Sequence, residues 1–306
     1  MQGILPKIIG MGLNLWSLVA PKQAAKMAVK VFSTPPKPRL RPKERQFLDT
    51  ARQVQRAVAG QNIVEYHWGA PEAPLVFLSY GWAYNAGRWR HFVPDLLEAG
   101  YRVIAYDPPG HGLAPSGPMS IPVNAAIIRA LLEDYGAPFA MVGHSFGGSS
   151  SIYAIKELPR ALHPRRMVVM ASFSFAPRVF WQYKKALNLW SPLYWNMVRG
   201  FEKRVGHSID YYDFAIMSAA YPHIEGLLVH DPGDPVTPFE ESRRIHDFWP
   251  GSHLYSPTEG GHHLGTEGIT NAVLRFVRHG EIPAQAQRQE RPLPAGHELV
   301  RHFVGV

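Results

Sequence analysis

The feature that most constrains the fold of this chain is the ten-residue stretch 139–148, which reads FAMVGHSFGG. The apolar run 139–142 is typical of a buried strand, a G-x-S-x-G motif centred on Ser145 follows at once, and residues 149–157 predict a helix. Strand, G-x-S-x-G and helix in this order indicate a nucleophile elbow, the tight turn that exposes a serine hydroxyl at the end of its strand. The first N–H groups of the helix would then point toward whatever Ser145 attacks.

Length and composition are those of a globular protein with a large core. The 306 residues are enough for one large α/β domain or two small ones, and 46% hydrophobic with 18% charged residues supports a well-filled interior. Cysteine is absent, which excludes disulfides and thiolate metal sites and suits a reducing compartment. We therefore expect a cytoplasmic protein, and the serine chemistry that the elbow indicates implies no metal or organic cofactor.

The positive charge is confined to one end of the chain. Residues 1–60 hold eleven Lys and Arg but only two acidic residues, whereas residues 61–306 hold 21 basic and 22 acidic residues. An enzyme of nucleic acids would spread positive charge around its cleft. The sequence therefore argues against a nucleic-acid partner and marks residues 1–60 as a basic N-terminal arm.

The arm itself predicts two helices followed by an extended connector. Residues 3–20 are apolar, but Pro6 and Lys7 interrupt them, so they do not predict a membrane span. A signal peptide is not expected either, because no A-x-A site follows and Pro21 comes directly after Ala20. Residues 21–32 predict an amphipathic helix with lysines on one face, namely Lys22, Lys26 and Lys30. The proline-rich segment 33–45 is expected to be extended.

Two placements of this arm stay open. Residues 1–32 could lie on an anionic bilayer with Trp16 and Phe32 buried in it, which would make the protein peripheral to the inner face of the membrane. Alternatively, both helices pack on the protein's own body with the lysines in solvent. The confinement of charge to the arm favours the first placement slightly. The oligomeric state is not indicated.

From residue 61 the pattern alternates strand and helix, which predicts a mostly parallel sheet with helices on both faces. Strands are expected at 62–67 as an edge strand and at 75–79, 101–106, 139–142, 167–170, 227–230 and 252–255. Helices are expected at 89–99, 121–134, 149–157, 240–248 and 270–279.

One interval, residues 172–221, lacks a strand pattern and is rich in aromatic residues. Twelve of the 36 aromatic residues of the chain lie between residues 173 and 214. We interpret it as a helical lid inserted after the strand at 167–170, with some rings lining a pocket. The remaining domains are then the arm, a core of residues 61–171 and 222–282, and a polar tail over residues 283–306.

A serine needs a neighbouring base, usually a histidine oriented by a carboxylate, and these partners should follow later strands of a parallel sheet. Asp231 and Asp234 follow the strand at 227–230, and His262 and His263 follow the strand at 252–255. Asp234 is favoured because it lies further into its loop, and His262 because it follows two glycines. The order Ser, Asp, His agrees with the elbow.

The remaining histidines are expected in ordinary surface or core positions, which fits His144, His207 and His297. A developing oxyanion needs two N–H donors, and we expect them from Phe146 and from Trp82, in the loop that follows the strand at 75–79.

Together these motifs resemble the α/β-hydrolase superfamily, and in particular serine esterases and lipases with a short helical cap. The resemblance covers residues 62–280 and depends on Gly81-Trp82, Asp107-Pro-Pro-Gly-His-Gly112, the elbow, Asp234-Pro-Val-Thr-Pro238 and Gly261-His262. It implies an α/β-hydrolase fold, a triad of Ser145, Asp234 and His262, and oxyanion donors at Trp82 and Phe146. The chain departs from the family in having Tyr80 where a histidine usually precedes the glycine of the oxyanion loop.

The expected function is hydrolysis of a carboxylic ester with an apolar acyl or alcohol part. The substrate is expected to contact residues around the elbow and in the lid, namely Tyr80, Gly81, His144, Trp181, Trp190, Tyr194 and Trp195. Two alternatives stay open. The same triad could cleave thioesters, amides or C–C bonds or form peracids, or the fold could serve as a binding protein. Haloalkane and epoxide opening are disfavoured, because the enzymes of those reactions that resemble this chain have Asp where Ser145 stands.

Overall fold

The computed structural model describes residues 4–290, and the chain divides into two compact units. The sheet unit consists of residues 36–174 and 214–290. The helical unit consists of residues 4–35 and 175–213.

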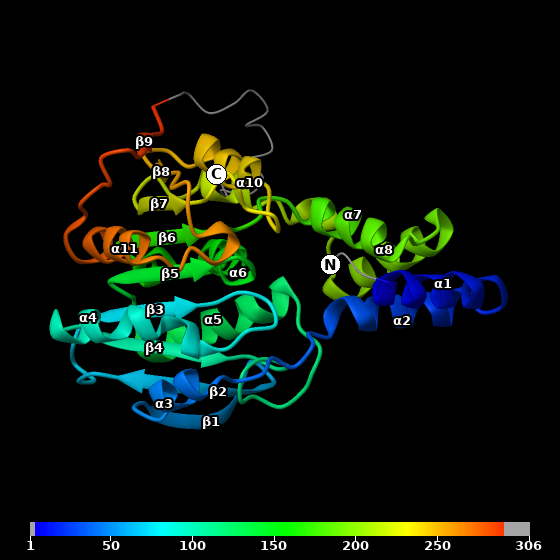
Figure 1. Ribbon diagram of the computed structural model, residues 1–306, viewed down its shortest axis with the longest axis horizontal. Coiled ribbons are helices and arrows are strands. Elements are labelled where there is room, and N and C mark those ends of the chain that lie inside the picture. The colour runs from blue at the N-terminus through cyan, green and yellow to red at the C-terminus, as the bar shows by residue number, and fades with distance from the viewer. Residues whose placement is uncertain (1–3, 291–306) are drawn as a thin grey trace. The chain divides into compact units, whose positions relative to one another are not determined.

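One sheet organises the sheet unit, with the strands in the order β1-β2-β4-β3-β5-β6-β7-β8-β9 (Figure 1). The strands are β1 (Arg52–Val58), β2 (Gln61–Trp68), β3 (Leu75–Ser79), β4 (Arg102–Asp107), β5 (Ala140–His144), β6 (Arg166–Met170), β7 (Glu225–Val229), β8 (His253–Tyr255) and β9 (Gln287–Arg288). The six strands from β4 to β8 in this order pair in parallel, while β1, β2 and β9 are joined by antiparallel pairing.

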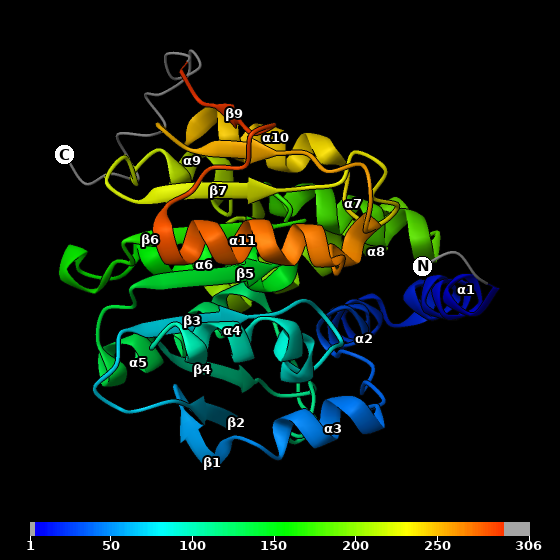
Figure 2. The ribbon, with the colours of Figure 1, turned by 60° about the vertical axis from the view of Figure 1, so that its left-hand side comes forward.

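Helices cover both faces of this sheet. Figures 1 and 2 show α4 and α11 on one face and α5, α6 and α10 on the other. The helices and 3-10 turns are α3 (Pro42–Leu48), η1 (Ala86–His91), α4 (Val93–Glu98), α5 (Ile121–Tyr135), α6 (Phe146–Lys156), η2 (Arg160–Leu162), α9 (Phe214–Ser218), α10 (Phe239–Phe248), η4 (Gly261–His263) and α11 (Glu267–His279). Because helices cover both faces, β3, β5 and β6 are buried along their whole length, which explains their continuous apolar runs.

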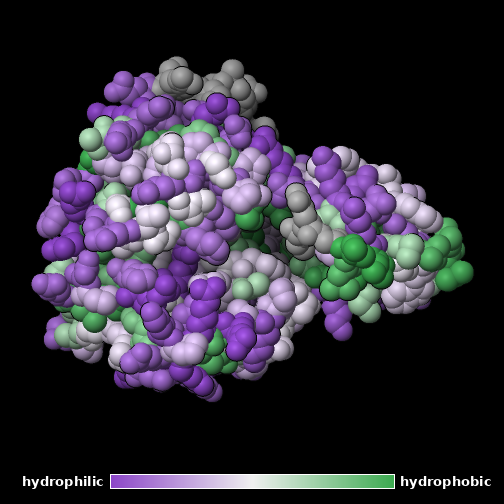
Figure 3. Space-filling model, viewed as in Figure 1, coloured by the Kyte–Doolittle hydropathy of each residue, from purple (hydrophilic) through white to green (hydrophobic). Residues whose placement is uncertain are grey.

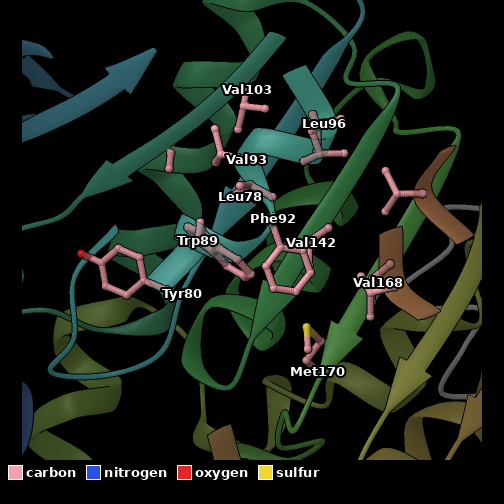
Figure 4. Packing of buried hydrophobic residues seen from close by; sticks show 14 of the residues in the cluster. Leu78, Tyr80, Trp89, Phe92, Val93, Leu96, Val103, Val142, Val168 and Met170 are labelled. Carbon is pink, nitrogen blue, oxygen red and sulfur yellow. The ribbon is translucent and has the colours of Figure 1, made fainter. Parts of the chain in front are cut away.

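One core cluster of the sheet unit lies between the central strands and the helices of one face, which include η1, α4 and α11. Leu78, Val142 and Val168 project from neighbouring strands toward Trp89 and Phe92 (Figure 4). Burying such side chains contributes about 1.5–3 kcal/mol each. This packing fixes the carboxyl ends of the parallel strands, where the candidate site lies.

Several sequence predictions need correction. The strand at 62–67 was expected at the edge, but β2 pairs with β1 on one side and β4 on the other. The sequence did not predict β1, because this strand is mostly exposed and its sequence RQVQRAV has no apolar run. β9 lies in the segment predicted as a polar tail, and it pairs with β8. The predicted helix at 89–99 divides into η1 and α4.

The connector at 33–45 was also expected to be extended throughout, but α3 begins within it, at Pro42. Pro42 suits the first turn of a helix. The carboxylate of Glu44 is buried and accepts hydrogen bonds from the Arg41 N–H, the Tyr84 hydroxyl and the Asn85 amide. These long-range contacts stabilise a short helix that local composition does not indicate.

The helical unit contains α1 (Ile4–Val19), α2 (Pro21–Ser33), α7 (Ala176–Leu187), α8 (Ser191–Val205) and η3 (Ile209–Tyr211). α2 packs against α8, and α1 packs against α2 and α7. Phe32 of α2 lies in an aromatic cluster, with ring centroids 4.5 Å from Phe180, 4.9 Å from Tyr183 and 6.3 Å from Phe201. The apolar side of α2 is therefore buried within this unit. Across residues 4–290, no helix has the length and apolar character that crossing a bilayer requires.

Candidate active site

Ser145 lies in a strained turn between β5 and α6. Its backbone has φ 52° and ψ −121°, a region that residues other than glycine rarely adopt. The turn requires close backbone approach, because a Cβ at Gly147 would lie 2.5 Å from the carbonyl oxygens of Ser79 and Tyr80. The Ser145 N–H donates to the Met170 carbonyl, which ties the turn to the end of β6. The elbow expected from the sequence motif is present.

Three side chains from three separate loops meet at this turn. The Oγ of Ser145 lies 3.1 Å from Nε2 of His262, and Nδ1 of His262 lies 2.8 Å from Oδ2 of Asp234. A carboxylate only accepts, so Nδ1–H of His262 donates to Asp234. Nε2 is then free to accept the Ser145 hydroxyl proton. This is the tautomer that a serine nucleophile needs from its base.

The carboxylate of Asp234 is fully buried and well supplied with donors. The N–H groups of Val236 and Thr237 donate to Oδ1 at 2.7 and 3.0 Å, and Nε2 of His230 lies 3.3 Å from Oδ2. Burial alone would raise the pKa of Asp234, but the hydrogen bonds from His230, His262 and these N–H groups hold it well below its usual value. The group is therefore ionised at neutral pH.

The alternative acid and base have other partners. Asp231 accepts the N–H of Gly233 with Oδ1 and the N–H of Gly261 with Oδ2, so it holds the turn after β7 against the loop that carries His262. His263 is exposed, and its carbonyl oxygen accepts a hydrogen bond from Arg88 at 2.5 Å. Of the four candidates, the structure brings Asp234 and His262 to Ser145.

Two neighbours of the site were not predicted. His230 is fully buried, and its Nε2 donates to the Thr237 carbonyl at 2.9 Å while facing Asp234. Its Nδ1 lies 2.7 Å from the Ser242 hydroxyl. The only signal in the sequence was its position, directly after the β7 run and four residues before Asp234. Arg88, which holds the His263 carbonyl, lies too far along the chain for spacing to reveal it.

The loop after β3 passes directly beside the serine. A Cβ at Gly81 would lie 3.0 Å from Nδ1 of His144 and 3.1 Å from Cβ of Ser145, closer than ordinary contact, so glycine suits this approach. The ring of Trp82, in the same loop, packs edge-on against Phe146 with centroids 5.2 Å apart. Within residues 4–290, the N–H groups of Trp82 and Phe146 have no hydrogen-bond partner. Both backbone donors therefore stay available next to Ser145.

The described residues hold no cluster of three or more His, Cys, Asp or Glu side chains suited to a metal ion.

Comparison with known proteins identifies the family of the chain. A family model described as alpha/beta hydrolase family matches residues 75–268, more than half of the chain. The chain belongs to the alpha/beta hydrolase family. The solved structure of an esterase from Exiguobacterium antarcticum superposes with a TM-score of 0.57 at 18% identity, covering 74% of this chain and 99% of that one. That likeness shows the α/β-hydrolase fold.

Two curated relatives have different reactions in their names. Epoxide hydrolase A of Mycobacterium tuberculosis is 37% identical over 112 residues, which is 35% of this chain and 33% of that protein. The bifunctional esterase/perhydrolase DCH of Acinetobacter calcoaceticus is 31% identical over 103 residues, which is 33% of this chain and 37% of that protein. The chain thus matches about a third of the length of each relative.

The departure from the usual alpha/beta hydrolase pattern, at Tyr80, has a structural explanation. Tyr80 is buried, and its hydroxyl donates to Oδ1 of Asp107 at 2.6 Å. The same carboxylate accepts the Tyr66 hydroxyl and the N–H groups of Ala86 and Leu113. Burial raises the pKa of Asp107, and these hydrogen bonds oppose the rise. Tyr80 therefore anchors the loop after β3 to the core. Its side chain points into the core, which does not support the predicted contact with a substrate.

His144 is likewise buried, and its Nε2 donates to the His262 carbonyl at 2.7 Å. Burial, with the nearby Arg88 and His262, lowers the pKa of His144 well below its usual value, so the ring is neutral. The neutral ring of His144 lies against Gly81 and bonds to the loop that carries His262, so it connects these two loops. This position does not support the substrate contact predicted for His144. In the helical unit, Tyr194 is buried and three tryptophans are exposed, namely Trp181, Trp190 and Trp195. For those four residues and for Gly81, contact with a substrate stays a prediction.

Proposed function

We propose that this alpha/beta hydrolase is a serine hydrolase that cleaves carboxylic esters with an apolar acyl or alcohol part. The observation that carries the proposal is the unbroken series of hydrogen bonds from Ser145 through His262 to the buried, ionised Asp234. Such a series raises the nucleophilicity of a serine that would otherwise be inert at neutral pH.

The reaction proceeds through an acyl-enzyme. Ser145 Oγ attacks the ester carbonyl carbon while Nε2 of His262 takes the hydroxyl proton, and Asp234 stabilises the imidazolium. The tetrahedral oxyanion accepts hydrogen bonds from the N–H groups of Trp82 and Phe146. His262 then returns the proton to the departing alcohol. Water, deprotonated by the same ring, releases the acid and restores Ser145.

Epoxide opening fits a serine poorly, although an epoxide hydrolase is among the relatives. A carboxylate that opens an epoxide forms an ester, which water can cleave in a second step. Ser145 would form an ether instead, and a hydroxyl-bearing ether has no carbonyl for water to attack. Peracid formation is a better second candidate, because hydrogen peroxide can replace water in the second step of the acyl-enzyme route. One relative is named as both esterase and perhydrolase.

Labelling with a fluorophosphonate tests the nucleophile directly. We expect covalent modification of the parent and of Ser149→Ala, whose hydroxyl donates to the Phe173 carbonyl away from His262, but none of Ser145→Ala. Ester hydrolysis should follow the same order. If Ser145→Ala, with an unchanged circular dichroism spectrum, hydrolyses p-nitrophenyl esters at the parental rate, the proposal is wrong.

A substrate panel then separates the chemistries. Esters from acetate to octanoate, a thioester, an amide, and acetate with hydrogen peroxide would be compared by kcat/KM. Each CH₂ that is buried adds about 0.8 kcal/mol, so kcat/KM should rise roughly three- to fourfold per methylene until the pocket is full. A steady decline from acetate onward would contradict the apolar substrate class.

A further inference from the structure

Helix α1 has an unusual distribution of side chains, because its apolar residues face outward. Nine large apolar side chains of α1 are between 38 and 84% exposed: Ile4, Leu5, Ile8, Ile9, Met11, Leu15, Trp16, Leu18 and Val19. The buried residues of the helix are Gly10, Leu13 and Asn14, on the opposite side. We call the nine exposed residues the α1 apolar face. Figure 3 shows hydrophobic side chains gathered where Figure 1 draws α1.

Specific contacts hold α1 in this orientation. The amide of Asn14 donates to the Asn188 carbonyl, and its Oδ1 accepts the N–H of Trp190, both at 2.9 Å. A Cβ at Gly10 would lie 1.6 Å from the Leu187 carbonyl oxygen, so this side of α1 meets α7 at close range. Rotating α1 to bury its apolar face would break both Asn14 hydrogen bonds and lose this close packing. The outward position of the apolar face is therefore fixed by the fold of the helical unit.

Contiguous exposed apolar surface of this kind normally marks an interaction site. The other helix of the arm contributes exposed positive charge to the same unit. α2 buries Ala24, Ala28 and Val29 within the helical unit, while its three lysines stay exposed: Lys22, Lys26 and Lys30. The membrane contact predicted for Phe32 is thereby wrong, since Phe32 packs among aromatic rings of the same unit.

The charge of the helical unit limits what can cover this surface. Residues 1–35 and 175–213 hold ten Lys and Arg against three Asp and Glu, and the first 35 residues hold no acidic residue. A second copy of the chain would present the same excess of positive charge, so pairing through α1 would be opposed by repulsion. A partner with negative charges at its surface and an apolar layer beneath them would suit both the α1 apolar face and the positive charge of the unit. An anionic lipid bilayer has this chemistry.

We propose that the α1 apolar face and the exposed lysines of the helical unit dock the protein on anionic bilayers. α1 lies in the plane of the interface with its apolar face among the acyl chains. A 16-residue helix is about 24 Å long, too short to span a hydrocarbon core of about 30 Å. Trp16 takes the position that tryptophan favours at the boundary between headgroups and acyl chains. This assignment does not depend on the reaction at Ser145, because every residue it uses belongs to the helical unit.

Vesicle co-sedimentation of the full chain tests the proposal. We expect sedimentation with vesicles of phosphatidylcholine and phosphatidylglycerol at low salt, much less at 0.5 M salt, and little with phosphatidylcholine alone. Ile8→Ser with Leu15→Ser should abolish binding. Lys22→Gln, Lys26→Gln and Lys30→Gln should lower the partition coefficient by roughly fivefold per lysine.

Matched controls keep the outcome clear. Lys37→Gln with Lys43→Gln removes two exposed lysines of the sheet unit and should leave binding unchanged. All substituted side chains are exposed, so melting temperatures should stay at the parental value. Binding should also shift tryptophan emission to the blue, and Trp16→Phe should reduce that shift. The proposal fails if the parent does not sediment, if Ile8→Ser with Leu15→Ser binds like the parent, or if that variant instead dissociates a dimer seen by light scattering.

Discussion

At the scale of single residues, Asp231 and Asp234 are three positions apart, yet their carboxylates bind different partners. Asp234 bonds to the ring of His262, whereas Asp231 bonds to the backbone N–H of Gly261 one residue earlier. One carboxylate orients the imidazole, and the other holds the loop that carries it. The sequence offered both residues as candidates for the acid, and the positions of their carboxylates in the folded loop distinguish them.

These contacts predict unequal effects of matched substitutions. Asp234→Asn and His262→Ala should lower kcat by about 10³–10⁴-fold with little change in KM, because they remove groups that act in the transition state. Asp231→Asn and His263→Ala should each lower kcat by less than about tenfold. Steady-state kinetics on one p-nitrophenyl ester compares all four. A larger kcat loss in His263→Ala than in His262→Ala would exchange the two histidines in the mechanism.

Asp234 also makes stability depend on pH. Its folded-state pKa lies below the unfolded value of about 3.9, because the hydrogen bonds from His230, His262 and the backbone outweigh burial. Such a group stabilises the fold above the unfolded pKa and loses that contribution as pH falls through the folded pKa. We expect Asp234→Asn to melt below the parent at pH 7 and the gap to narrow from about pH 4 toward pH 2. Thermal denaturation across this range measures the gap, and a constant gap would contradict the prediction.

At the scale of elements, the loop after β3, which carries the proposed oxyanion donor Trp82, is tied to a buried carboxylate at the end of β4. Asp107 joins β2 through Tyr66, β3 through Tyr80, and the start of η1 through the Ala86 N–H. With the Leu113 N–H, four hydrogen bonds tie the ends of these elements to one buried group. This network stands where the alpha/beta hydrolase family usually has a histidine before the oxyanion glycine.

Removing one tyrosine hydroxyl at a time separates stability from activity. Tyr66→Phe and Tyr80→Phe each remove one donor from Asp107 and should lower the free energy of unfolding by about 1–3 kcal/mol. Of the two tyrosines, only Tyr80 is adjacent in the chain to Gly81 and to the proposed oxyanion donor Trp82. Tyr80→Phe should therefore also lower kcat, by about tenfold or more. Urea denaturation and ester kinetics on both variants provide the test. Equal kcat losses would show that the oxyanion loop does not depend on Tyr80 in particular.

At the scale of the whole molecule, the chain combines a neutral sheet unit with a basic helical unit. The helical unit joins the first 35 residues to a segment that begins about 140 positions later, at Phe175. α2 covers Phe180 and Phe201 through Phe32, so the arm is part of the fold of this unit.

Truncation tests that dependence. Deleting residues 1–33 should expose Phe180, Tyr183 and Phe201 and lower the melting temperature by several degrees or cause aggregation. Deleting residues 1–19 alone removes α1, whose large apolar residues are mostly exposed already, and should cost less. Scanning calorimetry of both truncations compares them. A larger loss for residues 1–19 than for residues 1–33 would contradict the packing of α2 on α8.

Much of the sheet unit could be predicted because its signals are local. A buried parallel strand needs a continuous apolar run, and the elbow needs glycines around Ser145, so each element is visible in a short window. The candidates Asp234 and His262 followed from the rule that functional side chains lie at the carboxyl ends of parallel strands. The elements that the sequence did not predict have no local signal. β1 and β9 are largely exposed, and α3 depends on the contact of Glu44 with Tyr84, 40 positions away.

The sequence by itself therefore determined the alternation of the buried parallel strands with helices, the tight turn at Ser145 and the types of residue available around it. Only the tertiary structure decided which residues meet, because Ser145 and His262 are 117 positions apart and their distance depends on the order of strands in the sheet. It also decided that Tyr80 points into the core and that His230 supports Asp234. For α1, periodicity alone could not say which face is buried. Asn14 and Gly10 turn its polar and small side inward, since hydrogen bonds and close backbone contact hold it there.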